Sequence, residues 1–307
     1  MIIRKTSQQG FVLPLALIIL GILTGLAMSL SGQARNKLQE IQRQQTAWQH
    51  ELAYRSVLQH VIHILLAGET AYNRVRLDKL QIPIDGQTVT IKGLDVQIQD
   101  GAGLMGLGWY RADWMNRLLR QLTSPKNANR ISDELADWID ADSIRRRNGM
   151  EAAGYLAANK GYLPRNAAIR TLDELLELPS MTAELYNGNA ERFGLRDLLL
   201  VGGTDHINVA TAVAPVLQAA LDLSAQQTQK IISIRQHQNW AQLAKLLPEY
   251  HEAYGDYGPY TPSNVYRINI RKKNAAVLTA IIRLTPNKPT PYEIVIWDYP
   301  DNERGWI

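Results

Sequence analysis

Four acidic residues in the middle of the chain have the chemistry and spacing of a cation site. Asp137 and Asp140 are three residues apart, so a helix places both carboxylates on one face. Asp142 lies close to them if the helix ends there, and Glu151 or Asp133 could complete the shell. Hard oxygen ligands of this kind suit calcium. The sequence therefore raises a calcium site as a hypothesis, with no cofactor required.

The acidic segment does not match an EF-hand loop. Such a loop needs another Asp or Asn at position 144 and a glycine at 145, where this chain has Ile144 and Arg145. The competing interpretation is a helix C-terminus whose solvated carboxylates pair with the three arginines at 145–147.

The sequence contains no pattern of a catalytic centre. The six histidines form no metal-spaced pair beside a carboxylate, and the chain has no cysteine. No Gly-x-Ser-x-Gly elbow and no phosphate-binding loop occurs. We therefore expect a protein that is not an enzyme.

Two segments, 175–186 and 207–235, are similar to helix-hairpin-helix DNA modules. In such modules, glycines let backbone N–H groups approach a phosphate. The hairpins here are Pro179–Thr182 and Asp222–Ser224, and neither contains glycine. The arginines at 145–147 also have no interleaved aromatic residues on which bases could stack. We expect no nucleic-acid partner, although a membrane-tethered DNA receptor remains the alternative from another class.

Composition is that of a folded protein with one large domain or two ordinary ones. The chain has 307 residues, of which 46% are hydrophobic and 20% charged, and its net charge is +4. This mild positive charge is spread along the chain and does not require an acidic partner.

The N-terminus contains the strongest single signal. Phe11–Leu30 is an uncharged run of about twenty residues, enough to span a bilayer as a helix. Arg4 and Lys5 before it favour a cytoplasmic N-terminus with the rest of the chain outside. Three interpretations compete: a secretory signal cleaved near Ser31–Ala34, a plain anchor, or a prepilin leader cleaved after Gly10.

The residues after the membrane segment favour continued helix. Ser31–Ala71 has no proline and two glycines, and it is rich in helix formers. Gln33–Gln45 is polar nearly all round, as expected of a stalk. Farther on, an apolar stripe at helical spacing predicts a face that packs on a domain, formed by Tyr54, Leu58, Val61 and Leu65. We expect one helix of about 55 residues.

The remaining sequence predicts helices between strands. Val89–Gln99 has the alternation and the Lys–Gly turn of a hairpin. From Tyr110 to about Leu247 nearly everything has helical spacing, and Tyr250–Pro262 has the composition of a linker. Strands resume at 265–270, 275–284 and 292–297.

In this order and spacing, several segments resemble the K-type minor pseudopilins of bacterial type II secretion (the general secretion pathway protein K family), within the type IV pilin superfamily. The resemblance covers Gly10 to about Pro248. The segments that carry it are Gly10–Phe11, Asp137–Asp142, Gly149 with Glu151 and Tyr155, Tyr162–Asn166, Thr171–Leu178, Met181–Thr182 with Tyr186, Ile207–Ala212 and Val216–Leu217.

The resemblance implies an α+β, pilin-like fold with a long N-terminal transmembrane helix, a small antiparallel sheet and a large inserted all-α domain. The implied divisions are a leader at 1–10, a transmembrane part at 11–32, a pilin-like domain at 33–103 and 260–307, and an inserted domain at 104–259.

The resemblance also implies a function. Prepilin peptidase would cleave between Gly10 and Phe11, and Phe11 would be methylated. The subunit would remain in the inner membrane with its large C-terminal part in the periplasm. It would cap and nucleate a pseudopilus with the I-type and J-type minor pseudopilins and the major pseudopilin, for export of folded proteins. A type IV pilus minor pilin is an alternative.

The chain departs from the family pattern at several positions. Most pilins have a glutamate at position five of the mature helix, which is thought to pair with the N-terminal amine of the neighbouring subunit. Here that position is Leu15, so the resemblance implies a subunit at the filament tip. Gly103–Gly108 replaces an asparagine-containing stretch, and Ala152 and Ala210 replace polar residues. Calcium in the helical domain is a further property that the resemblance implies.

Overall fold

The structure is a computed structural model that describes residues 12–189, 191–272 and 277–301. The chain divides into two compact units, Met1–Ser56 and Val57–Ile307. The predicted processing junction, Gly10 and Phe11, lies outside the described residues.

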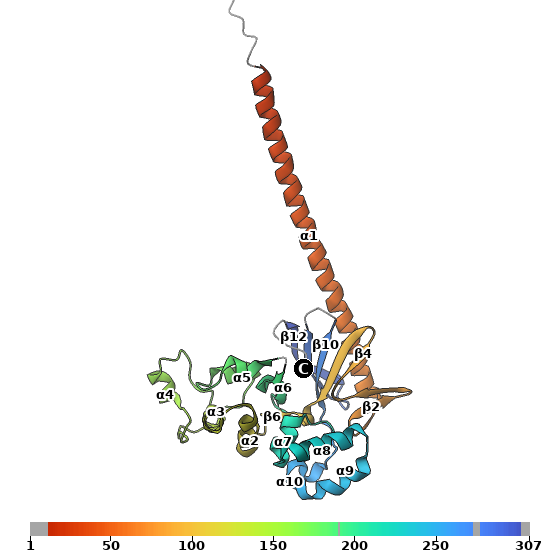
Figure 1. Ribbon diagram of the computed structural model, residues 1–307, viewed down its shortest axis with the longest axis vertical. Coiled ribbons are helices and arrows are strands. Elements are labelled where there is room, and N and C mark those ends of the chain that lie inside the picture. Colours follow the sequence, from red (N-terminus) through yellow and green to blue (C-terminus); the bar gives the residue numbers. More distant parts are fainter. Residues whose placement is uncertain (1–11, 190, 273–276, 302–307) are drawn as a thin grey trace, which may run out of the picture. The chain divides into compact units, whose positions relative to one another are not determined.

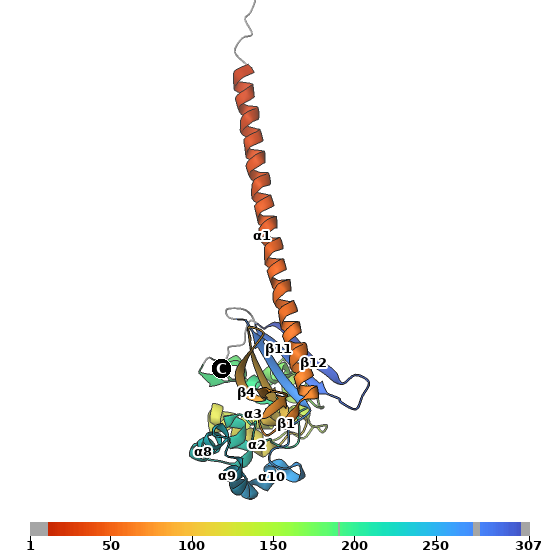
Figure 2. The same ribbon diagram turned by 90° about the vertical axis from the view of Figure 1, so that its right-hand side faces the viewer.

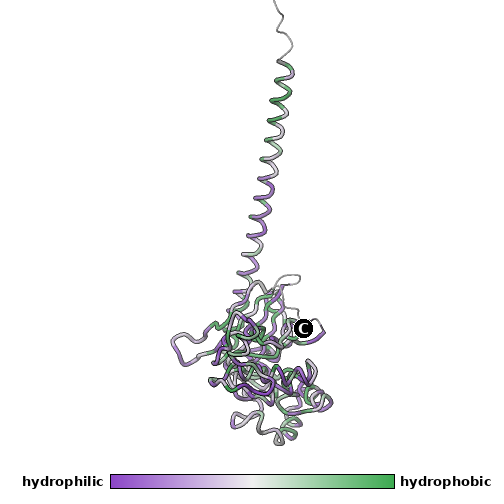
Figure 3. The backbone as a smooth tube through the Cα atoms, turned by 90° about the vertical axis from the view of Figure 1, so that its left-hand side faces the viewer, coloured by the Kyte–Doolittle hydropathy of each residue, from purple (hydrophilic) through white to green (hydrophobic). Residues whose placement is uncertain are grey.

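Helix α1 is a single helix of 56 residues, Val12–Ala67. Its N-terminal part is hydrophobic and is followed by a hydrophilic stretch (Figure 3). Within the described residues it is the one helix long and apolar enough to cross a membrane, a criterion that a signal sequence would also meet. Its length agrees with the predicted helix of about 55 residues. Gly68 donates the last helical bond, to the Ile64 carbonyl, and the chain then enters a strand.

The end of α1 belongs to the second unit, where its apolar stripe is buried. Leu58, Val61 and Leu65 are each at most 6% exposed. Gln59, on the same turns, exchanges hydrogen bonds with the Tyr292 hydroxyl of the last strand. The predicted stripe therefore packs within the domain, because burying its apolar surface stabilises the fold.

The main sheet is antiparallel and has five strands in the order β12-β11-β10-β5-β4 (Figures 1 and 2). It joins strands from both ends of the second unit. These are β4 (Asp85–Ile91), β5 (Leu94–Asp100), β10 (Val265–Arg271), β11 (Val277–Leu284) and β12 (Tyr292–Asp301). The late strands agree with prediction to within a few residues. The pairing of β5 with β10 brings the chain back to this sheet after the helical region.

The predicted hairpin is the β4–β5 pair. Lys92 and Gly93 form its turn with φ of 49° and 79°. Two residues of positive φ make a turn whose twist matches the strands, and glycine adopts this conformation without steric cost.

Three smaller sheets complete the strands. One is three-stranded, in the order β1-β2-β3. Its strands are β1 (Glu69–Ala71), β2 (Arg74–Leu77) and β3 (Leu80–Pro83). The other two are the parallel pair β6 (Met105–Gly106) with β9 (Leu199–Leu200) and the antiparallel pair β7 (Gly188–Asn189) with β8 (Arg192–Phe193).

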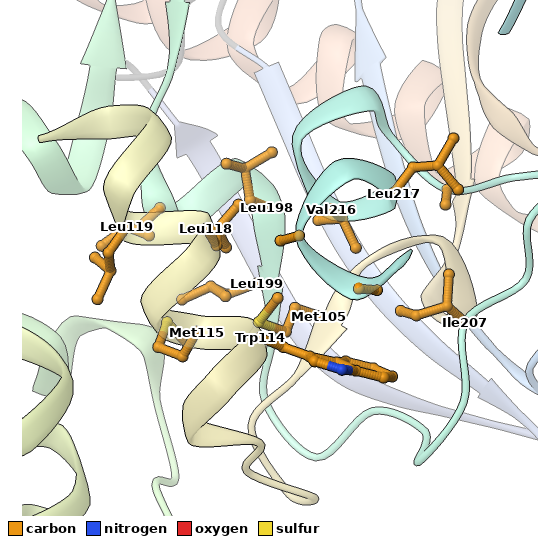
Figure 4. Close-up of a cluster of buried hydrophobic side chains, with 14 of the residues drawn as sticks. Met105, Trp114, Met115, Leu118, Leu119, Leu198, Leu199, Ile207, Val216 and Leu217 are labelled. Carbon is orange, nitrogen blue, oxygen red and sulfur yellow. The ribbon is translucent and has the colours of Figure 1, made fainter. Parts of the chain in front are cut away.

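The helices between β5 and β10 enclose an extensive apolar core (Figure 4). Leu118 of α2 points toward Leu198 and Leu199, and Val216 of α7 faces them from the other side of the cluster. The α-helices are α2 (Ala112–Leu122), α3 (Pro125–Ile139), α4 (Ala152–Ala157), α5 (Ala183–Asn187), α6 (Leu195–Leu198), α7 (Ala214–Leu221), α8 (Ala225–Gln236), α9 (Trp240–Leu246) and α10 (His251–Tyr254). The 3-10 helices are η1 (Gly101–Gly103), η2 (Leu172–Glu177), η3 (Leu247–Tyr250) and η4 (Gly255–Tyr257). The α+β fold class and the substantial helical content agree with prediction.

The prediction of nearly continuous helix from 110 to 247 was wrong. Long irregular segments occupy 140–151, 158–171 and 201–213. Asn159 and Asn166 have φ near +50°, which interrupts a right-handed helix. Apolar spacing alone could not reveal these breaks, since irregular loops also bury apolar residues here, such as Ile169.

The segment 250–262 is not the linker that its composition predicted. Ala253 and Tyr254 are buried, and the Tyr254 hydroxyl donates to the Leu247 carbonyl. The carbonyls of Ala253 and Pro259 accept from the backbone of the 207–209 loop. The tyrosines make the segment apolar enough to join the core.

Candidate functional site

The part of α1 beyond its apolar run exposes a stripe of large hydrophobic side chains. Leu38, Ile41, Trp48 and Leu52 are 58%, 58%, 65% and 62% exposed. With Gln45 they alternate in steps of three and four residues, the spacing of about 3.5 residues at which one helix packs along another. We name these five residues the stalk stripe. The stalk stripe contradicts the prediction that Gln33–Gln45 is polar nearly all round, and its heptad spacing is the signal in the sequence that could have revealed it.

Leu15 lies in the first turns of α1, and its side chain is 45% exposed. A leucine offers no charge and no hydrogen-bonding group to a neighbour. A carboxylate at this depth would be costly in a membrane unless it were paired.

The acidic cluster begins at the end of α3, whose start is fixed by Ser124 and Pro125. The Ser124 hydroxyl accepts from Asn127 N, and Pro125 occupies the first turn. The helix ends at Ile139, as the cation hypothesis required, and Asp140 is its C-cap.

Asp137 is fully buried and belongs to an ion pair. Its Oδ1 accepts from the Arg146 guanidinium at 2.8 Å, and Arg146 N also donates to this carboxylate. The same guanidinium contacts Asp140. A Cβ on Gly149 would lie 2.0 Å from Asp137 Oδ2, so the loop needs glycine for this close approach. Part of the competing interpretation, carboxylates paired with arginine, therefore holds for Asp137.

The structure brings the other three predicted ligands together. Asp140, Asp142 and Glu151 each offer a carboxylate oxygen within 4.8 Å of the others. Glu151 is the N-cap residue of α4, so the 140–151 loop returns it to the end of α3. Asp137 is not a member of this acidic triad.

The triad has unsatisfied oxygens. Both carboxylate oxygens of Glu151, which is 6% exposed, and Oδ1 of Asp140 are buried without a hydrogen-bond partner among the described residues. Burial raises the pKa of Glu151, and the charges of Asp137, Asp140 and Asp142 raise it further. A cation among these oxygens would remove both the desolvation cost and the repulsion.

A second buried carboxylate, Asp100, was missed by the sequence analysis. It is 0% exposed and accepts hydrogen bonds from Ala102 N, Asn208 Nδ2, Thr211 Oγ1 and both N and Oγ of Ser263. All its partners are donors within the fold, which makes it a structural group. The signal in the sequence was that Asp100 directly follows the alternating segment Val89–Gln99, where an acidic side chain can accept hydrogen bonds at the end of a strand.

Comparisons with known proteins agree on one family. The family model for type II secretion system protein K matches residues 108–189. Protein K of Klebsiella pneumoniae is 31% identical over 146 residues, which cover 46% of this chain and 44% of that protein. Protein K of Dickeya chrysanthemi is 33% identical over 39% of this chain and 33% of its own length. The matched region thus spans less than half the length of these two relatives.

Two matches cover more of the chain at lower identity. Protein K of Pectobacterium carotovorum is 24% identical over 79% of this chain and 80% of that protein. The fold is similar to a crystal structure of the GspK–GspI–GspJ complex of enterotoxigenic Escherichia coli, with a TM-score of 0.53 and 17% identity over 83% of this chain and 98% of that chain. At this identity the likeness shows the fold alone. Together with the family model and the relatives, it makes this chain similar to the type II secretion system protein K family in sequence over its middle part and in fold over most of its length.

Proposed function

We propose that this chain is a membrane-anchored minor pseudopilin that assembles through α1 with other pilin-like subunits at the tip of a type II secretion pseudopilus. The observation that carries the proposal is the stalk stripe, which continues α1 beyond its apolar run and exposes four large apolar side chains at heptad spacing. Its occupants are the α1 helices of neighbouring subunits. The role is structural and not catalytic.

Leu15 supports the tip position. A subunit without a carboxylate there cannot pair with the N-terminal amine of a subunit above it, while its own amine after cleavage at Phe11 can still receive one from below. The neighbours we propose are the I-type and J-type minor pseudopilins and the major pseudopilin. The chain would be processed by prepilin peptidase and hold its larger unit in the periplasm.

A cysteine scan of α1 tests the proposal, since the chain has no cysteine of its own. Leu52 belongs to the stalk stripe, whereas the exposed Ala47 lies on the opposite side of the helix, given about 3.6 residues per turn. We expect L52C in this chain to form disulfides with cysteines placed in α1 of the I-type or J-type subunit in intact cells. A47C serves as the matched control.

A charge on the stripe gives the functional arm of the test. We expect W48E to abolish co-purification with the two minor pseudopilins and to reduce secretion, and A47E to leave both unchanged. Equal cross-linking from the two faces, or full assembly of W48E, would show that the stripe is not the assembly surface.

We also propose that the acidic triad binds calcium. Asp140, Asp142 and Glu151 would supply carboxylate oxygens, and calcium would offset the negative charge that the single contact of Arg146 with Asp140 leaves in the triad. The unsatisfied oxygens of Glu151 and Asp140 support this proposal over that of a purely solvated surface.

Thermal unfolding of the full chain in detergent, with calcium or with chelator, tests the triad. We expect calcium to stabilise the wild-type chain and E184Q, an exposed control, but not E151Q. In chelator, E151Q should be more stable than wild type, because it removes the repulsion and the cost of burying an unpaired charge. The same calcium response in E151Q and wild type would exclude this site.

A further inference from the structure

A cavity of about 260 Å³ lies between the β1–β2 hairpin and the turn that joins α8 to α9. It is separate from the acidic triad and from the stalk stripe. Two arginines, an aromatic pair and several amides line it, and none of its described lining residues carries a carboxylate. The lining residues are Ala71, Tyr72, Asn73, Arg74, Arg76, Gln81, Gln238 and Trp240.

The two arginines are available to a ligand. Arg74 and Arg76 are two residues apart on β2, so both project from the face opposite the buried Val75. In the described part of the chain, neither makes a side-chain hydrogen bond or an ion pair, and Nε of Arg74 is buried without a partner. A buried N–H donor without an acceptor is costly, so an acceptor entering the cavity would be stabilised.

The walls of the cavity are held in place by contacts of their own. Tyr72 stacks on Trp240 with ring centroids 4.3 Å apart and an interplanar angle of 1°. The amide of Asn73 donates to Asp85 at 2.8 Å, which fixes the turn of the hairpin. A ligand would therefore meet a preformed site, and binding would lose little conformational entropy.

Both walls are also shaped by residues of positive φ. Tyr72 and Gln238 have φ of 55° and 52°. Gln238 follows the C-terminus of α8, where such a residue is a common cap. Tyr72 is the first residue of the two-residue β1–β2 turn, where positive φ matches the twist of the strands, and it is 39% exposed.

The charge around the cavity matches one carboxylate. Glu69 lies directly opposite Arg76 in the β1–β2 register, close enough to offset part of its charge. Asp85, which accepts from Asn73 of the lining, offsets it further, so the local charge suits a carboxylate better than a dianionic phosphate. A guanidinium can bind a carboxylate through two parallel hydrogen bonds.

The neighbouring strand suggests how the carboxylate arrives. All residues of β1 are exposed, and β2 is its one neighbour in the three-stranded sheet. An extended peptide can add to such an edge through its backbone. Ala71 pairs with Arg74 and is small, so an acidic side chain on the added strand can reach over it to Arg74.

We propose that this cavity binds an acidic peptide segment of a partner protein, in extended conformation along β1, with a carboxylate held by Arg74 and Arg76 beside Tyr72. Peptide binding at this cavity does not depend on assembly through the stalk stripe, so either proposal can be wrong while the other holds.

Fluorescence anisotropy with the full chain in detergent tests it, using a short fluorescein-labelled peptide of alternating Glu and Thr. A peptide with Gln for Glu is the neutral control. We expect R74Q/R76Q to bind the acidic peptide at least about tenfold more weakly than wild type. R76Q alone should also weaken binding. Because Arg76 is exposed, this variant tests the proposal even if the double variant does not fold. R145Q/R147Q removes the same formal charge from exposed residues elsewhere and should bind as wild type.

The location of the peptide needs its own readout. With 5-fluorotryptophan in the chain and W240F to assign the signal, the Trp240 fluorine resonance should move on addition of the acidic peptide and not of the neutral one. Equal loss of affinity in R145Q/R147Q, or an unmoved Trp240 resonance, would overturn the proposal. So would binding of inorganic phosphate or an oligogalacturonate in place of the peptide, since the ligand would then belong to another class.

Discussion

Asp100 and Ser263, which are 163 positions apart in the sequence, are joined by two hydrogen bonds inside the second unit. Asp100 Oδ1 accepts from Ser263 N at 2.8 Å and from Ser263 Oγ at 2.7 Å. Asp100 ends β5, and Ser263 lies just before β10, the strand that pairs with β5. The contact therefore fixes the chain where it leaves the sheet for the helical region and where it returns.

The first prediction concerns this carboxylate. D100N should lower the free energy of unfolding by about 2–4 kcal/mol, because an amide cannot accept from all the donors that now surround Asp100. D95N, on the same strand and partly exposed, should change it by less than about 0.5 kcal/mol. Urea unfolding of the full chain in detergent, followed by tryptophan fluorescence, measures both. Equal stability of D100N and D95N would mean that the network contributes nothing.

The second prediction concerns the pH dependence of stability at Glu174. Burial alone would raise the pKa of Glu174, but hydrogen bonds from Arg165, Arg170 N, Trp138 and Thr171 N outweigh it, so the pKa lies below its usual value. A lowered pKa in the folded state means that the stabilisation is complete above the unfolded-state pKa of about 4.3. It is lost as the pH falls through the folded-state pKa.

E174Q should therefore be less stable than wild type by about 1–3 kcal/mol near pH 7. The difference should shrink once the pH is below the ordinary carboxyl range. The unfolding of wild type and E174Q is compared from about pH 3 to about pH 7, a range that includes the ordinary carboxyl pKa. E184Q is the exposed control. A difference that stays constant with pH would rule out the charge of Glu174 as its source.

The third prediction concerns Gly103, in the stretch where the family pattern has asparagines. A Cβ at Gly103 would lie 2.3 Å from Gln99 Nε2 and 2.6 Å from the Thr211 carbonyl oxygen. These two atoms are hydrogen-bonded to each other, so neither can move away freely. G103A should cost about 1–3 kcal/mol or more. G161A has no atom within 4 Å of the new Cβ and should be close to neutral. Thermal unfolding distinguishes the two variants.

The fourth prediction concerns processing. If the chain is a prepilin, mass spectrometry of the mature protein should find an N-terminus at Phe11 with one added methyl group. G10V should keep the leader, whereas Q9A should be cleaved as wild type. A mature chain that begins near Gln33 or Arg35 would instead identify a secretory signal and would remove the membrane-anchored account.

Local patterns in the sequence predicted the elements whose formation depends on nearby residues. The β4–β5 hairpin follows from Lys92–Gly93, because a glycine of positive φ makes the turn. The length of α1 follows from a long run of helix formers whose single proline, Pro14, lies in the first turn, where it interrupts no helical hydrogen bond. The late strands, with their β-branched residues, were equally readable.

Contacts between distant segments were not predictable in this way. The spacing of Asp137, Asp140 and Asp142 suggested one shared site, but Arg146 binds Asp137, and Glu151 completes a triad without it. The segment 250–262 had the composition of a linker, yet Ala253 and Tyr254 are packed into the core. In both cases the arrangement depends on residues that loops bring into contact from other parts of the chain.

By itself, the sequence determined that this protein has one apolar N-terminal helix continued by a stalk, an antiparallel hairpin, and the motifs of its family, because periodicity, propensity and turn chemistry act over a few residues. Only the tertiary structure decided which carboxylates share a site, that Asp100 joins the two ends of the helical region, and that Tyr72 and Trp240 line one cavity with Arg74 and Arg76. Those relationships are contacts between residues far apart in the sequence. The free energy that stabilises them is distributed over the whole core.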